Sequence, residues 1–473
     1  MGDMIVPQNN APPLAGQGGS KMKNFNLLAR SLILSFVLSI SFFVGPASAR
    51  QVSQAPGPVN NPQPGLLVTA AYPPPVEAVV SYTTFDLSTN VASLYLADIN
   101  NQSGVIRKHT IDSLTWGTSN NLFLGASDMV LSPWTNEIHM VYPKRTSANA
   151  PGTAIYVHKQ MGSNNFIFET IPYPSTLNND YFIDTDIILT DPSTGGRVIM
   201  GLLAYETNLF NYYLAERQSN GSWTFQVVPL GPTTAMTSPK YLELSYEYVN
   251  STTELIHIDY IRSVSNGSST CEYVRLDVNF SQPGWPVFTS QTVFSSFNTS
   301  IGPSHFGPFL GQNNSTPLVS SFNIENFIGN AGISGFYLKN FQLNSPPQLL
   351  AVNGRSGSTA SVGGNSTLTF NVVEEENNGL RELVYYLHDG INTLARNVLR
   401  SVSLYTSFFN AAIDQGMNTI AISFMRPISF SPLGEIIYNE IDPVGNVLNS
   451  HIVESCLSGS RTCSGPIQIR VLR

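Results

Sequence analysis

The feature that most constrains this 473-residue chain is a unit of four short strands that recurs along it. Three stretches show the unit clearly, and they begin SDMVLSPWTNEIHMVY, TDIILTDPSTGGRVIMGLLAY and YLELSYEYVNSTTELIHIDYI. Each has a short apolar strand, a turn rich in Pro, Ser, Thr, Asn or Gly, and a second apolar strand with a Tyr near its end. A polar loop and two alternating strands follow. The pattern predicts an all-β fold built from repeated antiparallel sheets.

The spacing of the units predicts how the sheets are arranged. Successive first strands lie roughly 40 to 60 residues apart, which is typical of four-stranded propeller blades. One blade cannot bury both of its faces, so copies pack radially until a ring closes. We therefore expect a β-propeller, since two packed β-sandwiches would explain the strands but not the spacing. First strands are expected near Asp128, Asp186 and Leu242, and less clearly near Phe306, Thr367 and Phe408.

The two ends of the domain predict how the ring closes. The run VEAVVSYTTFDL, with ASLYLADI and GVIRKHTI, lacks an innermost strand, and the terminal GPIQIRVL could supply it. Counting this first unit gives seven blades, and six is the alternative because the unit from Thr367 to Ser403 is short. Cys456 and Cys463 flank the turn-like LSGSRT, so in an oxidising compartment we expect a disulfide that fastens the closing strand.

The N-terminal residues predict export from the cytoplasm. Basic residues precede an apolar stretch from about Leu32 to Val44, and the small residues of Ala47-Ser48-Ala49 follow it. This order is typical of a signal peptide, and the apolar stretch is shorter than the ~20 residues of a spanning helix. We expect a signal peptide at 22–49, with an uncleaved N-terminal anchor as the alternative. Either places the rest of the protein outside the cytoplasm, secreted or at the cell envelope.

The remaining boundaries follow from composition. Residues 1–21 are rich in Gly, Pro, Asn and Gln, and we expect an extension of the gene model or a disordered stretch. The Pro-rich, uncharged segment 50–75 predicts an extended linker. The propeller domain is then expected to span 76–473.

The charge of the chain argues against nucleic acid as a partner. It has 23 Lys and Arg against 31 Asp and Glu, a formal net charge of −8, and no basic cluster. Such a chain repels phosphate backbones. The sequence also lacks a phosphate-binding Gly-rich loop and a Gly-X-Ser-X-Gly motif. The expected partner is a glycan or a protein, with membrane contact only through an uncleaved N-terminal segment, and no cofactor is expected apart from the Ca²⁺ considered below.

The repeat resembles the irregular propellers of secreted proteins, including sialidase-like and lectin-like members. The sialidase Asp-box is Ser-X-Asp-X-Gly-X-X-Trp, and the nearest text, SNGSWT at 219–224, lacks the Asp and the spacing. The Trp-Asp ends of WD40 repeats and the YWTD pattern are also missing. The resemblance covers most of the mature chain but is one of architecture, and no specific family is secured. It implies a site in the funnel formed by loops that enter the innermost strands.

Aligning the inner strands gives the candidate site residues. These lie near comparable positions at the strand starts, and they are Asp128, Asp184 or Asp186, Glu243 and His305. Such a ring could bind Ca²⁺ through oxygen ligands, or pair an acid with a base or nucleophile for glycoside cleavage. Five-bladed glycosidases carry an Asp, Asp, Glu set on successive inner strands, and the likeness here is one of residue type. Alternatively, these carboxylates accept backbone N–H bonds at blade junctions or face water.

Two classes of function stay open. The first is a non-catalytic, secreted or surface-displayed propeller that recognises a glycan or protein ligand through its loops. The second is a glycan-acting hydrolase, with Asp128, Asp186 and Glu243 as hypothetical acid, base and orienting groups. The absence of a local catalytic motif favours the first, although sites on propellers are often assembled from dispersed residues.

Two smaller features carry predictions of their own. His139 and His257 occupy matching second-strand positions, in EIHMVY and LIHIDY, where we expect core or interblade hydrogen bonding rather than metal ligation. The acidic run Glu374-Glu375-Glu376 is expected at an inter-strand turn, as a solvated tip or a cation-binding loop.

Overall fold

The computed structural model describes the chain from residue 77 to residue 471, with gaps. The gaps are 116–122, 126, 133, 147–151, 173–180, 191–195, 207–208, 229–238, 251, 266–268, 298, 304, 307–318, 327–334, 342–345, 362–366, 404–408, 416–418, 428–433 and 458–459. The predicted signal peptide and linker lie outside the described residues. Within the described part every regular element is a strand, and no helix there is long and apolar enough to cross a membrane.

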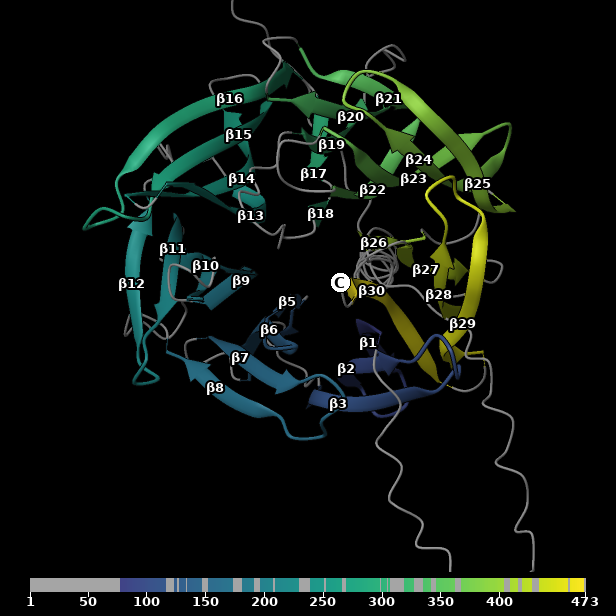
Figure 1. Cartoon of the computed structure of the whole chain (residues 1–473), viewed down its shortest axis with the longest axis horizontal. Helices are drawn as coiled ribbons and strands as arrows, with labels where there is room; N and C mark the ends of the chain where they lie inside the picture. The colour runs from purple at the N-terminus through teal and green to yellow at the C-terminus, as the bar shows by residue number, and fades with distance from the viewer. Residues whose placement is uncertain are drawn as a thin grey trace, which may run out of the picture. The chain divides into compact units, whose positions relative to one another are not determined.

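The strands form seven sheets that are arranged radially about a centre, as a β-propeller (Figure 1). The sheets are named blades 1 to 7, and the strands of each are given from the centre outward. Blade 1 contains β30 (Arg461–Val471), β1 (Ala78–Asp86), β2 (Val91–Ile99) and β3 (Ile106–Thr115). Blade 2 contains β5 (Asp128–Ser132) and β4 (Phe123–Leu124), then β6 (Glu137–Arg145), β7 (Thr153–Gln160) and β8 (Ile167–Ile171).

The next two blades are regular four-stranded sheets with short hairpin connections. Blade 3 contains β9 (Tyr181–Leu189), β10 (Val198–Glu206), β11 (Leu209–Arg217) and β12 (Trp223–Val228). Blade 4 contains β13 (Pro239–Asn250), β14 (Thr253–Ser265), β15 (Ser269–Asn279) and β16 (Val287–Phe297).

The last three blades include one extra short strand. Blade 5 contains β17 (Thr299–Pro303), β19 (Val319–Asn326), β20 (Gly335–Asn340) and β21 (Gln348–Val352). Blade 6 contains β18 (His305–Phe306), which pairs in parallel with β22 (Gly354–Ser361), and then β23 (Thr369–Asn377), β24 (Leu380–His388) and β25 (Thr393–Ser403). Blade 7 contains β26 (Ala412–Gln415), β27 (Ile420–Pro427), β28 (Gly434–Ile441) and β29 (Val447–Cys456).

The core consists of side chains pressed between neighbouring blades. Six clusters of buried apolar residues in the described part lie at the junctions of blades 1–2, 2–3, 3–4, 5–6, 6–7 and 7–1. A middle strand such as β28 is buried along nearly its whole length, because blades cover both of its faces. Outer strands such as β25 have mostly exposed or half-buried side chains. The continuous apolar runs of the sequence are thus the middle strands of the blades.

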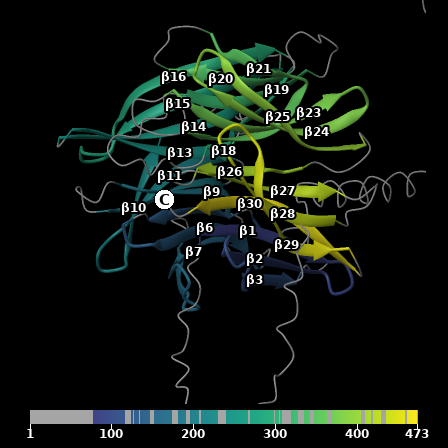
Figure 2. The ribbon, with the colours of Figure 1, turned by 45° about the vertical axis from the view of Figure 1, so that its right-hand side comes forward.

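The ring closes as the sequence predicts. β30 pairs antiparallel with β1, from Ala78 opposite Val471 to Asp86 opposite Arg461, and the two strands lie side by side in Figures 1 and 2. Cys456, at the end of β29, forms a disulfide with Cys463 in β30, with a Cα–Cα distance of 5.9 Å. The bridge therefore ties blade 7 to the closing strand of blade 1, which confirms the predicted disulfide.

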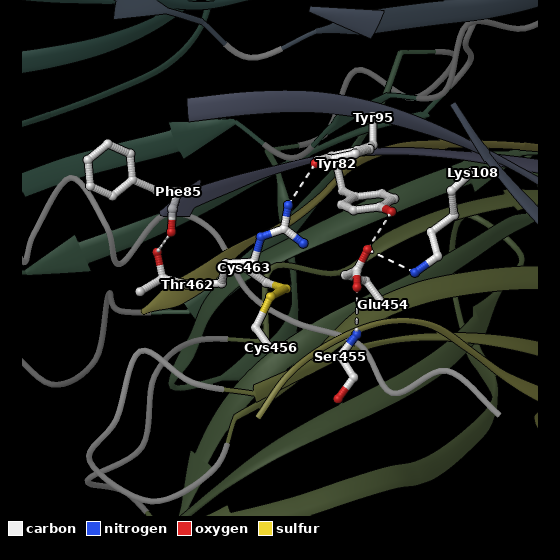
Figure 3. The surroundings of a disulfide bond; sticks show 10 residues. Tyr82, Phe85, Tyr95, Lys108, Glu454, Ser455, Cys456, Thr462 and Cys463 are labelled. Carbon is white, nitrogen blue, oxygen red and sulfur yellow. Dashed lines mark hydrogen bonds and ion pairs between the residues drawn. A yellow bond between two sulfur atoms is a disulfide. The ribbon is translucent and has the colours of Figure 1, made fainter. Parts of the chain in front are cut away.

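A polar contact beside the disulfide joins the same two blades (Figure 3). The Glu454 carboxylate on β29 accepts a hydrogen bond from the Tyr82 hydroxyl at 3.0 Å and pairs with Lys108 Nζ at 3.0 Å. Tyr82 is buried in blade 1. Burial and the neighbouring Glu454 carboxylate both raise the pKa of Tyr82, so its hydroxyl stays a donor. The closure is thus fastened by covalent, ionic and strand-pairing contacts.

Two of the expected first strands are wrong. Phe306 lies in β18, which belongs to blade 6, whereas the inner strand of blade 5 is β17. Thr367 precedes β23, which is the second strand of blade 6, and the inner strand is β22 with the sequence GRSGSTAS. A Cβ at Gly357 in β22 would lie 2.5 Å from Cε2 of Phe336 in blade 5. Close packing therefore requires small residues here, and they hide the strand from an apolar pattern.

The position of the disulfide predicts its contribution to stability. Replacing both Cys456 and Cys463 with Ser frees a loop with a sequence separation of 7, which costs about 2–3 kcal/mol of unfolding free energy by chain entropy. Urea unfolding of the double variant and of the wild type measures the difference. Cys271→Ser, which keeps the bridge, is the control, and equal stabilities of double variant and wild type would contradict the fastening role.

Candidate functional site

The structure brings three of the predicted carboxyl groups together at the inner strands of consecutive blades. Asp128 lies on β5, Asp186 on β9 and Glu243 on β13. Their exposed fractions are 7%, 4% and 7%. Asp186 lies beside Asp128 and close enough to Glu243 for the charges of both carboxyl groups to act on it. These three residues are called the acidic centre below.

Backbone N–H groups of the next blade hold the acidic centre in place. The Ile187 N–H donates to Asp128 Oδ2 at 3.2 Å and to Asp186 Oδ1 at 2.6 Å. The Leu244 N–H donates to Asp186 Oδ2. The innermost strand of a blade is an edge whose inward N–H groups have no strand partner, and carboxylates are strong acceptors for such groups. Asp128 and Asp186 thus accept hydrogen bonds from N–H groups on the inner edge of the neighbouring blade.

The same contact recurs on the other side of the ring. Ser358 Oγ in β22 accepts from the Ile413 N–H at 3.3 Å, and Asp414 Oδ2 in β26 accepts from the Val471 N–H at 2.8 Å. The four pairs that join consecutive blades are separated by 59, 58, 55 and 57 residues, one blade each. The alternative that the acids accept backbone N–H bonds at blade junctions therefore holds for Asp128 and Asp186.

The acidic centre includes a cation that sequence reasoning missed. Arg470 on the closing strand β30 places Nη2 at 3.6 Å from Asp128 Oδ1. Its Nη1 donates to the Ile469 carbonyl oxygen at 2.7 Å, and the residue is 4% exposed. Arg470 immediately precedes Val471, whose N–H donates the last interblade bond, so the interval of 55–59 residues is the signal that could have found it.

The surroundings of Asp186 change the pKa of its carboxyl group. Burial raises the pKa of Asp186 well above its usual range, and the adjacent Asp128 and then Glu243 raise it further, against the opposing bond from the Leu244 N–H. The pKa of Tyr212 is also raised, by burial and by the charges of Asp186 and Asp184. Asp186 therefore holds its proton to higher pH than an exposed aspartate. A carboxyl group that keeps its proton to higher pH can act as a general acid.

The remaining predicted site residues are Asp184 and His305. Asp184 is half-buried on β9, and its Oδ1 accepts from the Thr185 N–H at 3.0 Å. His305 lies in β18 with its backbone beside Ser358 of blade 6, and its side chain is outside the described part. Among the described residues no group of three His, Cys, Asp or Glu side chains is arranged to hold a metal ion. Calcium binding at the ring stays a prediction.

The two histidines are hydrogen-bonded as expected. His139 Nδ1 lies 2.6 Å from the Tyr156 hydroxyl. His257 Nδ1 lies 2.7 Å from Asp277 Oδ1, and His257 Nε2 lies 3.0 Å from Glu247 Oε2. All of these partners belong to the same blade as the histidine they contact, so the bonds strengthen single blades.

The acidic run at 374–376 is not at a turn, which corrects the expectation. It lies within β23, and Glu374 and Glu375 are 1% and 4% exposed. Arg381 Nε lies 3.2 Å from Glu374 Oε1, and Arg396 Nη2 lies 3.0 Å from Glu375 Oε2. The Phe409 N–H donates to Glu374 Oε2 at 2.7 Å, across to the segment that leads into blade 7. Arginines from neighbouring strands neutralise the run, so it can be buried.

Comparisons with known proteins add likenesses of fold and no family. No protein-family model and no curated protein sequence matches the chain. Among solved structures, an α-L-arabinanase of Penicillium chrysogenum complexed with arabinobiose has a TM-score of 0.45 at 9% identity, over 77% of this chain and 98% of that one. The haemagglutinin-neuraminidase ectodomain of parainfluenza virus 5 has a TM-score of 0.32 at 9% identity, over 91% and 94%. The α-L-arabinofuranosidase Arb93A of Fusarium graminearum, in complex with an iminosugar inhibitor, has 0.38 at 9%, over 71% and 95%.

The buried His139 predicts that the folded protein loses stability in acid. Burial lowers the pKa of His139 to about 4, while Glu137 opposes this shift and His158 and Arg217 add to it. Because the unfolded imidazole titrates near 6.5, the stability that it contributes is complete above pH ~6.5 and is lost as the pH falls towards 4, by about 3 kcal/mol. Urea unfolding of the wild type and of His139→Gln from pH 7 to 4 measures this. Between pH 7 and pH 4, His139→Gln should lose less unfolding free energy than the wild type. Equal losses in the two proteins would contradict the prediction.

The interblade contact at Asp414 predicts a stability difference between two substitutions. Asp414 is 4% exposed, and Asp414→Ala leaves the Val471 N–H without this acceptor, at a cost of about 1–3 kcal/mol. Asp414→Asn keeps a side-chain oxygen and should lose less. Chemical unfolding of both variants ranks them, and equal losses would show that the oxygen is not the stabilising group.

Proposed function

We propose that this protein is a secreted or surface-displayed propeller that acts on glycans, and that its acidic centre hydrolyses a glycosidic bond. One observation carries the proposal: Asp186, whose pKa is raised by burial and by neighbouring carboxyl groups, lies beside Asp128 and Glu243 on the inner strands of three blades. Glycoside hydrolysis needs one protonated and one ionised carboxyl group on opposite sides of the scissile bond. Inner strands are where a propeller presents such groups to its funnel.

The protonation pattern suggests a role for each residue. Asp186, with its raised pKa, is the general acid that would donate a proton to the leaving glycosidic oxygen. Glu243 would be the ionised partner, as nucleophile or as base towards water. Asp128 is in direct contact with Asp186, whereas acid and base in glycosidases are about 5–9.5 Å apart. Asp128 is therefore assigned to orient Asp186. All three roles differ from those expected from the sequence, in which Asp128 is the acid, Asp186 the base and Glu243 the orienting group.

A second candidate is glycan binding without turnover, and a different observation favours it. The oxygens of Asp128 and Asp186 already accept N–H bonds from blades 3 and 4, and each residue is at most 7% exposed. Carboxyl groups that already accept these bonds could have a purely structural role, joining one blade to the next. A ligand would then bind to the loops at the rim of the funnel.

Measurement of binding and turnover together separates the two candidates. A glycan array probed with residues 50–473, with and without Ca²⁺, would identify bound glycans, and chromatography of those glycans would reveal cleavage. Asp186→Asn and Glu243→Gln should each lower turnover by about 10²–10⁴-fold, the usual contribution of a general acid or base. Asp414→Asn is the matched control, because Asp414 makes the same backbone contact in blade 7 and should keep full turnover.

Each other outcome has a defined meaning. Binding without cleavage by the wild type supports the second candidate and overturns the first. Silence on the array points to a protein ligand. Cleavage that is equally fast in the Asp186→Asn and Glu243→Gln variants would place the reaction elsewhere in the molecule. Loss of binding on removal of Ca²⁺ would support the cation at the ring.

A further inference from the structure

We propose that Asn220 is an N-glycosylation site and carries an oligosaccharide on the hairpin turn between β11 and β12 of blade 3. The inference rests on the export from the cytoplasm that is part of the proposed function, and it is independent of catalysis. Asn220, Gly221 and Ser222 lie in SNGSWT, the text at 219–224 that falls short of a sialidase Asp-box. Asn-X-Ser/Thr is the acceptor sequence for N-linked glycans when X is not Pro, and such a triplet is called a sequon below.

Sequence alone does not select the asparagines that carry sugar, because the chain has nine sequons. They begin at Asn101, Asn220, Asn250, Asn266, Asn279, Asn298, Asn313, Asn314 and Asn365. In those that begin at 101, 220, 250 and 279, the Asn and the Ser or Thr both lie within the described residues. The surroundings of these sequons differ, and the differences distinguish acceptors from the rest.

The turn between β11 and β12 presents its whole sequon to solvent. The Gly221 N–H donates to the Gln218 carbonyl oxygen at 2.9 Å, and the Gln218 N–H donates to the Ser222 carbonyl oxygen at 2.8 Å. Gly221 has a φ of 78°, the left-handed conformation that a hairpin turn of this kind requires. A Cβ on Gly221 would meet no atom within 4 Å. The sequon therefore lies at the open tip of a hydrogen-bonded hairpin, where a bulky substituent has room.

The side chain of Asn220 is held by its oxygen and not by its nitrogen. Asn220 Oδ1 accepts from the Ser222 N–H at 2.9 Å and from the Ser222 hydroxyl at 2.7 Å. Among the described residues Asn220 Nδ2, the atom to which a sugar is attached, has no hydrogen-bond partner. Asn250 is also exposed, and its Oδ1 accepts from the Thr252 N–H and hydroxyl at the same two distances. We expect Asn250 to behave as Asn220 does.

Two other sequons differ at the atoms that matter. Asn101 Nδ2 donates to the hydroxyl of the buried Tyr438 in blade 7 at 2.8 Å, so the reacting nitrogen is already bonded across a blade junction. Asn279 is 7% exposed, and its Oδ1 accepts from the Ser281 N–H at 3.1 Å. A sugar on either residue would have to disrupt contacts of the folded ring, whereas a sugar on Asn220 would not.

The reaction is the transfer of an oligosaccharide from a lipid-linked diphosphate donor by the transferase of the secretory pathway. Asn220 Nδ2 attacks the anomeric carbon of the first sugar, a C–N bond forms, and the C–O bond to the diphosphate breaks. The lipid diphosphate leaves with the bonding electrons, and Nδ2 loses one proton to a base of the transferase. No oxidant or reductant takes part.

The place of Asn220 in blade 3 leaves the funnel free. The four strands are antiparallel, so Tyr181, where β9 starts, lies at the same end of the blade as Val228, where β12 ends. Arg217 and Trp223, which flank the turn, lie at the other end. A glycan on Asn220 is therefore attached at the end of the blade opposite the loop that enters the innermost strand.

Mass spectrometry of glycopeptides tests the proposal on the full chain secreted from cultured eukaryotic cells. An endoglycosidase that leaves one N-acetylglucosamine on asparagine marks each occupied site. This label is needed because an exposed Asn-Gly pair also deamidates spontaneously, so a change of Asn220 to Asp would not be specific. Asn220 should be occupied in nearly every molecule, and Asn101 and Asn279 in almost none.

Variants of the hairpin test the acceptor itself. Ser222→Ala keeps Asn220 but removes the hydroxyl, so occupancy at Asn220 should be lost, and Ser222→Thr should keep it. Thr224→Ala is the matched control and should leave occupancy unchanged. Thr224 Oγ1 accepts from Gln218 Nε2 at 3.0 Å on the same hairpin, but Thr224 lies outside the sequon. Asn220→Gln should leave any glycan binding and turnover unchanged, because the turn lies opposite the loop that enters the funnel.

Residues 50–473 behind a signal peptide of the host separate this proposal from the export on which it rests. Occupied Asn220 in that protein, with no sugar on any sequon of the chain that keeps its own N-terminus, would sink the predicted export and keep the acceptor site. The proposal is overturned if Asn220 is unoccupied behind the host signal peptide, or if Asn279 is occupied in the folded protein as fully as Asn220. Occupancy that survives Ser222→Ala would also overturn it.

Discussion

The N–H groups on the inner edge of each blade have to find acceptors at the centre of the ring. A sheet inside a propeller is covered on both faces by its neighbours, but its innermost strand has no further strand to pair with. In this protein, side chains of the preceding blade supply the acceptors, as with Asp186 for Leu244 and Asp414 for Val471. An unmet buried N–H costs about 1–3 kcal/mol. These contacts therefore help to fix both the angle between blades and the registry of their inner strands.

The position of the acidic centre follows from this constraint. Blades 2, 3 and 7 meet the requirement with the carboxyl groups of Asp128, Asp186 and Asp414, whereas β22 in blade 6 uses the neutral Ser358 at the corresponding contact. Because hydroxyl groups can accept the same bond, the ring does not require charge there. Buried carboxyl groups placed side by side instead carry an energetic cost, which appears as the raised pKa of Asp186. A cost of this kind is expected where a group has a role beyond packing.

Much of the fold was predictable because the middle strands are covered on both faces. Runs such as VIMGLLAY contain no charged or strongly polar residue, and their recurrence defines the blades. The closing strand and the disulfide were predictable because the first unit lacks a strand and two cysteines flank a turn. β22 could not be found in this way, since Gly357 packs against Phe336 and leaves no apolar signal. The acidic run of β23 was misplaced because its arginine partners are on other strands.

The candidate site was predictable only in part, for a related reason. Alignment of strand starts found Asp128, Asp186 and Glu243, but it compared the first strand of each unit with the next and so omitted the strand that ends the chain. Arg470 occupies the corresponding place in blade 1, one residue before Val471, whose N–H donates to Asp414. If β30 carried an acidic residue in place of Arg470, a fourth carboxyl group would lie near the three of the acidic centre. Asp128 would then lack its arginine partner. The chain instead carries a cation at the point of closure, with Arg470 Nη2 3.6 Å from Asp128 Oδ1, and the ring thereby sets a basic side chain against the first carboxyl group of the series.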